Sequence, residues 1–357
     1  MPPHPAFIVE CPSLTDMWRF GWNPGRTLRG ADLEAVLVSA AYGTDPLLRA
    51  GCEAVREGDV EAGATLLVET REDPEARAYR AEALGRAAVD RPDEVAALVE
   101  EGVDPVDTML WLGHTLLARA MALPSGGTGT GQADRKAFEA ALHEARVPLE
   151  EAARANPEDA APWSALQTVA MGLGDREERE RAWTEASARA PHLFPAHMTR
   201  VRALAPSRGG SAEEMFAAAG AAADTAPEGS PLPAVLALAH AEYLRGEQRR
   251  LVSEGNSAYI TSMALGRLHG EAVRELFELA QGWASAAAPH VRAVQAHHLF
   301  GWAFHRAGEQ DLARWHLGMV GRYVCDVPWS FFGSARTEAA LAMAELGVDP
   351  RDAEQGG

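Results

Sequence analysis

Apolar residues recur at helical spacing along most of the chain after residue 45, and this pattern predicts an all-α fold. Alternating β-branched stretches bounded by turn signals are scarce, which argues against a central sheet. Residues 1–43 follow the helical pattern less clearly, although the stretch GADLEAVLVSAAYG within them is compatible with a short helix. We therefore expect a partly irregular N-terminal extension at 1–43 and helices from residue 44 onward.

Three similar segments end in proline at a nearly constant interval. EAARANP ends at Pro157, EASARAP at Pro191 and AADTAP at Pro227, which gives intervals of 191 − 157 = 34 and 227 − 191 = 36 residues. Two helices and two turns occupy about 34 residues, and a proline ends the second helix. The interval therefore predicts stacked helical hairpins.

The interior of the repeat agrees with this prediction. Trp163 and Leu166 stand where the first helix needs inward-facing side chains, Gly174 marks the turn, and Trp183 faces inward from the second helix. Weaker versions of the pattern fit residues 45–74, with Pro74 as the stop, residues 107–121, and residues 297–317, with Gly308 at the turn.

These repeats predict helical hairpins over residues 44–333, interrupted by a flexible loop at 124–132. Residues 334–357 are expected to hold a capping helix, at about 335–346, and a short tail. The aromatic segment PWSFF at 328–332 is expected to fold over the end of the stack, because a terminal repeat otherwise leaves an apolar face in water.

The Trp-x-x-Leu pattern, the glycine turn and the terminal proline, at 34-residue spacing, resemble tetratricopeptide repeats. Residues 45–67, 190–197, 213–232 and 324–332 are in addition similar to a group of uncharacterised actinobacterial proteins with tetratricopeptide-like helices. The similarity covers roughly residues 45–345. It implies a right-handed α-solenoid of tetratricopeptide-like hairpins, and it carries no catalytic residues.

The net charge narrows the range of partners. Lys and Arg number 33 and Asp and Glu 51, so the net charge is −18, and this charge disfavours nucleic acid or an anionic membrane as a partner. A basic or neutral partner fits better. The three cysteines form no CxxC motif, and no signal peptide or membrane-spanning stretch is evident, so we expect a cytoplasmic protein.

The stretch QAHHLFGWAFHRAGEQDLARWH at 295–316 is the main candidate for chemistry. Helical spacing puts His298, Trp302 and His305 on one stripe, with Arg306 beside it. His297 falls instead on the packing stripe with the neighbouring phenylalanines. The four histidines of this stretch therefore do not share one face.

Three interpretations of this stretch stay open, namely ordinary packing, a groove for a peptide or small ligand, and a metal site. His298 and His305 are seven residues apart, or about 10 Å along a helix, which is too far for both to bind one zinc ion at about 2 Å without side-chain stretch. A third ligand would have to come from another helix, with His240 or Glu242 as candidates.

Other motifs indicate little chemistry. The glycine-rich GGTGTG at 126–131 follows no strand, and Lys136, the only lysine, follows arginine, so no phosphate-binding loop is present. HExxH and GxSxG are absent, and we expect no cofactor. Arg77, Arg80 and Arg86, with nearby glutamates, are interpreted as a solvated helix surface.

The sequence therefore predicts a protein- or peptide-binding scaffold that uses the concave face of its helical repeats. The alternative is an enzyme or biosynthetic tailoring protein that uses a histidine-rich groove, with a metal as one option. The sequence leaves the oligomeric state open. The candidate groove residues, expected to stack, donate hydrogen bonds and recognise carboxylates, are His298, Trp302, His305 and Arg306, with Glu242 and Tyr243 from a neighbouring helix.

Overall fold

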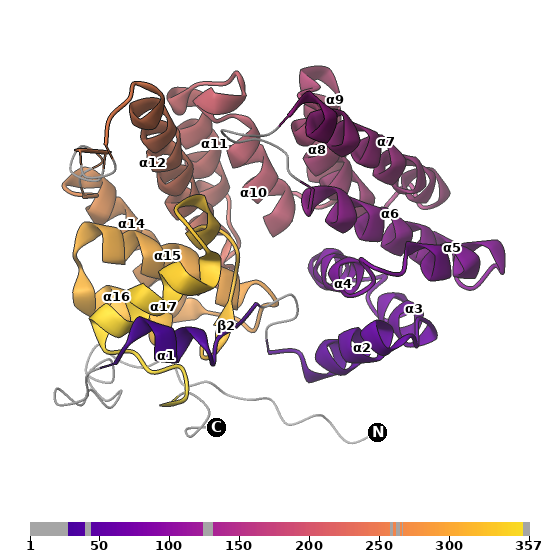
Figure 1. Ribbon diagram of the computed structural model, residues 1–357, viewed down its shortest axis with the longest axis horizontal. Helices are drawn as coiled ribbons and strands as arrows, with labels where there is room; N and C mark the ends of the chain where they lie inside the picture. Colours follow the sequence, from indigo (N-terminus) through magenta and orange to yellow (C-terminus); the bar gives the residue numbers. More distant parts are fainter. Residues whose placement is uncertain are drawn as a thin grey trace. The chain divides into compact units, whose positions relative to one another are not determined.

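The computed structural model describes residues 28–39, 44–123, 131–257, 260–261, 265 and 267–352. Helices make up most of these residues, so the fold is all-α (Figure 1). The chain forms two compact units. Unit 1 holds the described residues of 1–39, 226–241 and 251–357, and unit 2 holds those of 40–225 and 242–250. Most of the loop expected at 124–132 lies outside the described residues.

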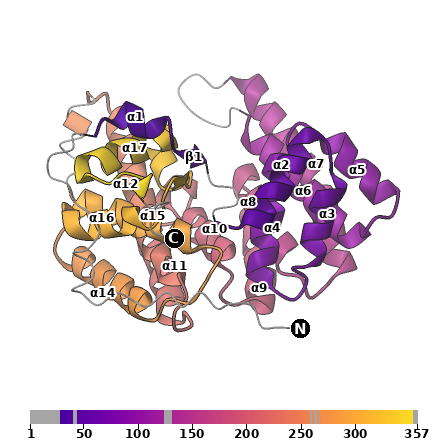
Figure 2. The same cartoon turned by 90° about the horizontal axis from the view of Figure 1, so that it is seen from below.

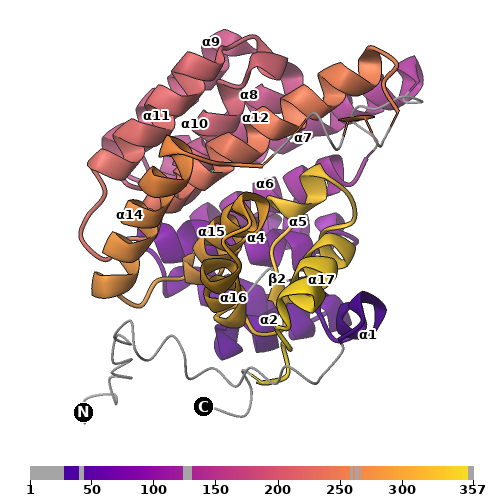
Figure 3. The ribbon, with the colours of Figure 1, turned by 90° about the vertical axis from the view of Figure 1, so that its left-hand side faces the viewer.

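Most helices of unit 2 pack on the next helix in the chain or on the one after it. Its helices are α2 (Pro46–Glu57), α3 (Glu61–Val68), α4 (Pro74–Ala87), α5 (Pro92–Glu100), α6 (Pro105–Met121), α7 (Gln132–Ala155), α8 (Ala161–Leu173), α9 (Arg176–Arg189), α10 (Phe194–Ala203), the 3₁₀ helix η2 (Pro206–Arg208) and α11 (Ala212–Asp224). Helix α4 packs on α6, α6 on α7, α7 on α8, α8 on α9 and α10, and α10 on α11. Figure 3 shows α8 to α11 running side by side.

The three prolines of the 34-residue pattern follow helix ends, as predicted. Pro157 follows α7, Pro191 follows α9 and Pro227 follows α11. Gly174 separates α8 from α9 with a φ of 73°, in the left-handed region that glycine adopts without strain. Asp175 then caps α9 by accepting a hydrogen bond of 3.0 Å from the backbone N–H of Glu178.

The expectation that Pro74 stops a helix is wrong, because Pro74 begins α4. Its missing N–H does no harm in the first turn, where backbone N–H groups have no partner within the helix. Asp73 precedes it and accepts a hydrogen bond of 3.0 Å from the N–H of Ala76. Asp-Pro also starts α2, where the Asp45 side chain accepts from the N–H groups of Leu47 and Leu48, and α6, where the Asp104 side chain forms no such cap.

Neighbouring helices approach closely where one of them carries glycine. A Cβ added at Gly63 would lie 2.4 Å from the ring of Trp111, and one added at Gly85 would lie 2.7 Å from the backbone carbonyl of His114. Comparable close approaches to leucine side chains occur at Gly51, Gly113 and Gly172. Small residues therefore set the spacing between these helices.

Unit 1 brings segments from both halves of the chain together. Its elements are α1 (Gly30–Glu34), β1 (Val38–Ser39), the 3₁₀ helix η3 (Leu232–Ala234), most of α12 (Val235–Ser253), α14 (Glu271–Ala286), α15 (Ala293–Ala307), α16 (Gln310–Gly318), β2 (Tyr323–Val324), the 3₁₀ helix η4 (Trp329–Phe331) and α17 (Ala335–Leu346). Residues 242–250 of α12 belong to unit 2.

The described part of the N-terminal extension packs on the C-terminal segment of unit 1. Helix α1 lies against α17 (Figure 2), and β1 pairs in parallel with β2, with Val38 opposite Tyr323. Arg336 donates a hydrogen bond of 2.6 Å from Nη2 to the carbonyl of Glu34. Helix α17 occupies the range in which the sequence predicts a closing helix.

No helix in the described ranges combines the length and the apolar character that a bilayer crossing needs.

A pair of glycine substitutions tests the spacing between the helices of unit 2. Gly85→Ala should lower the thermal unfolding temperature, because its Cβ meets backbone that cannot move aside, and overpacking of this kind costs about 1–3 kcal/mol. Gly220→Ala is the matched control in α11, with nothing within 4 Å of the added Cβ. It should leave stability unchanged or raise it by up to about 1 kcal/mol. Equal effects in thermal denaturation would contradict the packing described.

Candidate functional site

Two of the candidate residues on α15 lie inside unit 1. His298 is buried, and both of its ring nitrogens are engaged: Nε2 donates to the carbonyl of Tyr323 at 2.7 Å, and Nδ1 accepts from Nε1 of Trp329 at 3.0 Å. Trp302 is 2% exposed and stacks on Phe332 at 5.5 Å between ring centroids.

The segment at 328–332 therefore covers the stripe on which the sequence predicts a groove. Trp329 and Phe332 come from this segment, and η4 also packs on α17. The sequence predicted that these aromatic side chains fold over the end of the helical stack, and in the structure they pack on α15 and α17. The consequence for α15 is that His298 and Trp302 offer no surface to a ligand in this conformation.

The packing stripe of α15 confirms the interpretation of His297 as a packing residue. His297 and His316 share a hydrogen bond of 3.0 Å between their Nδ1 atoms, and the ring of His297 lies 4.7 Å from that of Trp283. Phe300 and Phe304 complete this aromatic core against His316. These histidines join α14, α15 and α16.

Burial keeps the histidines of this core neutral. Removal from water lowers the pKa of His297 to about 3 and that of His298 to about 4, and lowers the pKa of His316 well below its usual value. Each imidazole then acts as a neutral hydrogen-bonding ring. None of the three is poised to exchange protons near neutral pH.

His305 and Arg306 lie nearer the solvent, at the end of α15. Nε2 of His305 donates to Oε2 of Glu345 at 2.8 Å and so links α15 to α17. Arg306 is half-buried, and its pKa is lowered by burial and, to a lesser extent, by the charge of Arg267. Within the described ranges, no group of three or more His, Cys, Asp and Glu side chains is arranged to hold a metal ion.

Glu242 and Tyr243 belong to unit 2, whereas the four candidates on α15 belong to unit 1. Glu242 is 2% exposed, and its carboxylate accepts hydrogen bonds from Nε of Arg202 at 3.0 Å and from Nη1 of Arg245 at 3.1 Å. Tyr243 is 40% exposed, and its ring centroid lies 6.1 Å from that of Phe216 on α11.

Two further arginines, Arg208 and Arg249, share this neighbourhood, and neither belongs to the groove predicted from the sequence. The charge of Arg208 in η2 interacts with those of Arg202, Glu242, Arg245 and Arg249. Glu242, Arg245 and Arg249 stand at spacings of three and four residues, on one face of α12. We call Glu242 and the four arginines Arg202, Arg208, Arg245 and Arg249 the Glu242 arginine cluster.

Arg208 is the member whose charge is least satisfied. The side chain is half-buried, its Nε atom is buried without a hydrogen-bond acceptor, and the described residues provide it with no ion pair. Burial first, and then repulsion by the neighbouring arginines, lowers its pKa to about 10, although Glu242 opposes the shift. A buried donor without an acceptor costs about 1–3 kcal/mol, and more when it is charged.

Arg179 on α9 fixes the backbone that carries Arg208. Its Nη1 donates to the carbonyl of Ala203 at 3.0 Å and to that of Arg208 at 3.4 Å. Gly210 lets the turn fold back tightly, since an added Cβ would lie 2.1 Å from the carbonyl oxygen of Leu204. The chain from the end of α10 to η2 is therefore held in place without any contribution from the Arg208 side chain.

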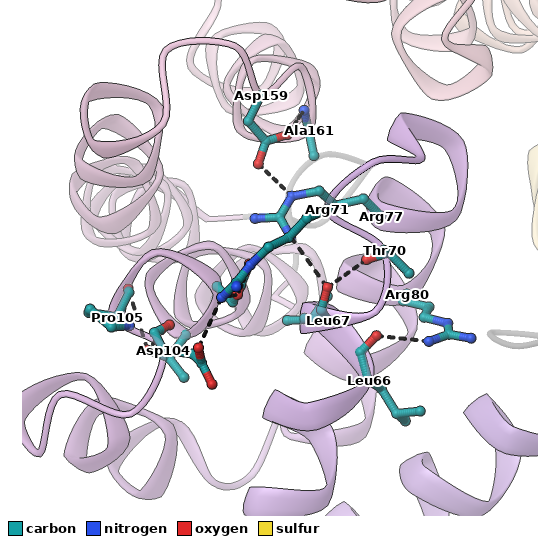
Figure 4. A network of polar contacts seen from close by, with 12 residues as sticks. Leu66, Leu67, Thr70, Arg71, Arg77, Arg80, Asp104, Pro105, Asp159 and Ala161 are labelled. Atoms are coloured by element: carbon teal, nitrogen blue, oxygen red, sulfur yellow. Dashed lines mark hydrogen bonds and ion pairs between the residues drawn. The ribbon is translucent and has the colours of Figure 1, made fainter.

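A second charged cluster in unit 2 differs because its charges are paired. Arg77 lies between two carboxylates: its Nε is 2.5 Å from Asp159 (Figure 4), and its Nη1 is 2.6 Å from Asp107. Arg71 contacts Asp107 from the other side and pairs with Asp104 at 2.9 Å. The sequence-based interpretation of Arg77 as a solvated surface residue is wrong, because its side chain is 2% exposed. This cluster joins α4, α6 and the start of α8.

Comparison of the chain with protein-family models, with curated proteins and with solved structures found no match.

Neutralising Asp107 should destabilise unit 2 far more than neutralising a surface carboxylate. Asp107→Asn removes a buried negative charge from Arg77, and breaking a buried ion pair costs about 3–5 kcal/mol. Glu139→Gln is the matched control, because Glu139 pairs with Arg135 on the exposed surface of α7 and such pairs contribute at most about 1 kcal/mol. Denaturant titration followed by circular dichroism measures both variants. Similar midpoints for the two would refute the role given to Asp107.

Acid should weaken unit 1 as the pH falls below about 6.5. The buried histidines have a lower pKa in the folded state than in the unfolded state, so their contribution is complete above the unfolded pKa and is lost as pH falls toward about 4 for His298 and about 3 for His297. Across this window, each histidine lowers the free energy of unfolding by about 1.4 kcal/mol for each unit by which the pH falls.

Histidine NMR between pH 7.5 and 5 tests this directly, because the resonances of His297, His298 and His316 should show no titration while the protein stays folded. A midpoint above pH 6 for any of the three would contradict their burial as neutral rings.

Proposed function

We propose that the protein is a non-enzymatic binding module, a right-handed α-solenoid of tetratricopeptide-like hairpins that binds a protein or peptide partner. The order of packing in unit 2, in which most helices pack on the next helix in the chain or on the one after it, supports a stack of hairpins. The placement of Pro157, Pro191 and Pro227 after helix ends supports the resemblance to tetratricopeptide repeats.

The surface that best fits a binding role is the Glu242 arginine cluster together with Tyr243. Four arginines and one glutamate give a local charge of 4 − 1 = +3, in a chain whose net charge is −18. Tyr243 supplies an exposed aromatic ring beside these charges, and arginine and tyrosine are enriched at residues that dominate binding energy. An acidic segment of a partner complements this surface.

One observation carries this proposal, namely that two arginines of the cluster have no carboxylate partner among the described residues. Arg202 and Arg245 bind Glu242, whereas Arg208 and Arg249 have no ion pair there. By contrast, Arg71 and Arg77 are neutralised by three aspartates. An anionic ligand can pair with this positive charge, which the described residues do not neutralise.

The alternative, an enzyme with a histidine-rich groove, has less support from the geometry. Both nitrogens of His298 are engaged in the interior, and His297 and His316 bind each other. Neither arrangement leaves a free base that faces a substrate. His305 reaches the surface, but its Nε2 atom already binds Glu345.

To test whether this surface binds the partner, we compare how much partner is captured by a variant of the surface and by a control variant elsewhere in unit 2. A double variant, Tyr243→Ala with Arg249→Glu, changes two exposed side chains of α12, and Arg135→Glu changes an exposed arginine of α7. Quantitative affinity capture from the native host should recover a specific partner with the unmodified protein and with Arg135→Glu, and about tenfold less with the double variant.

The recovered partner should then bind the purified protein directly, with the same dependence on the two sites. Equal recovery by all three proteins, at unchanged circular dichroism, would exclude this surface as the binding site.

A further inference from the structure

The Glu242 arginine cluster also specifies the kind of anion it can hold. Glu242 already occupies one carboxylate position, between Arg202 and Arg245. The charge of Arg208 interacts with those of Glu242 and Arg249, and neither Arg208 nor Arg249 forms an ion pair with a described residue. We therefore ask which chemical group could neutralise these two arginines.

Charge balance separates the candidates. The cluster carries 4 − 1 = +3. A further carboxylate carries −1 and would leave +2, whereas a phosphate monoester carries about −1.5 to −2 near pH 7 and would leave about +1 to +1.5. The phosphate therefore offsets more of the repulsion among the guanidinium groups.

Hydrogen-bonding capacity leads to the same choice. Arg249 is exposed and Arg208 is half-buried, and the guanidinium of each presents several donors in a planar fork. A phosphate monoester has three terminal oxygens that can accept from more than one arginine at once, and arginine is the preferred side chain for such recognition. A carboxylate has two oxygens and satisfies fewer of these donors.

The site is held in place before any ligand arrives. Arg179 fixes the backbone of residues 203–208 through two hydrogen bonds, and Glu242 holds Arg202 against α12. The ligand would therefore have to order few side chains on binding, which favours affinity.

We propose that Arg202, Arg208, Arg245 and Arg249 bind a phosphate monoester, carried by a phosphorylated side chain of the partner. This inference rests on the proposed function for the identity of the partner, but the phosphate site itself does not depend on it. Arg208 and Arg249 supply the donors that contact the phosphate, and Glu242 positions Arg202 and Arg245 beside it.

Calorimetric titration of the full-length protein tests the proposal at constant ionic strength. The probes are an otherwise uncharged peptide with one phosphoserine, the same peptide with serine or with glutamate, and inorganic phosphate. The phosphopeptide should bind saturably and inorganic phosphate should compete with it, whereas the serine and glutamate peptides should bind at least about tenfold more weakly.

Two variants and one control locate the site. Arg208→Gln and Arg249→Gln should each weaken phosphopeptide binding about tenfold, and Arg135→Gln should leave it unchanged. Because Arg249 is exposed, its substitution keeps the test valid even if Arg208→Gln alters folding. In the unmodified protein, the Nε–Hε NMR signal of Arg208 should shift on addition of phosphopeptide.

The outcomes separate this inference from the proposed function. Absence of saturable phosphopeptide binding, equal binding of the glutamate peptide, or unchanged binding by both variants would overturn the phosphate site. Saturation by inorganic phosphate without binding of the phosphopeptide would overturn its assignment to a phosphorylated side chain. Phosphopeptide binding, combined with partner recovery that does not depend on Tyr243 and Arg249, would keep the phosphate site and refute the proposed function.

Discussion

The close approach of helices at glycine is the constraint on which the rest of the structure depends. At Gly63 and Gly85 a neighbouring helix lies so near that a single added carbon would overlap it. This spacing lets side chains from different helices meet across the interior, as Arg77 meets Asp107 and Asp159. Non-directional apolar burial holds the helices together, and the small residues determine how near they come.

Unit 2 contains two charged clusters that differ in how their charge is balanced. In the cluster around Arg77, buried arginine and aspartate neutralise one another, and the result is a rigid connection between α4, α6 and α8. In the Glu242 arginine cluster one carboxylate serves four arginines, and positive charge remains. Positive charge held in a fixed arrangement without a counter-charge is characteristic of a binding site, because a ligand can supply the missing negative charge.

The periodicity of the sequence was sufficient to predict helices and the hairpins ending near Pro157, Pro191 and Pro227, because these features depend on local spacing. Pro74 was misinterpreted because a proline fits a helix start as well as a helix end. Spacing put His298 and Trp302 on one stripe, yet it could not show that residues 328–332 cover that stripe. The arginine cluster was missed because Arg208 and Arg249 come together only through the fold, and because a net charge of −18 says nothing about local charge.

Crystals soaked in tungstate would show whether the Glu242 arginine cluster binds anions. Tungstate is a tetrahedral dianion whose anomalous scattering locates it without ambiguity. We expect an anomalous peak within hydrogen-bonding distance of the guanidinium groups of Arg208 and Arg249, and no peak there when Arg208 is replaced by glutamine. If crystals bind tungstate elsewhere and show no peak at this cluster, the cluster is not an anion-binding site.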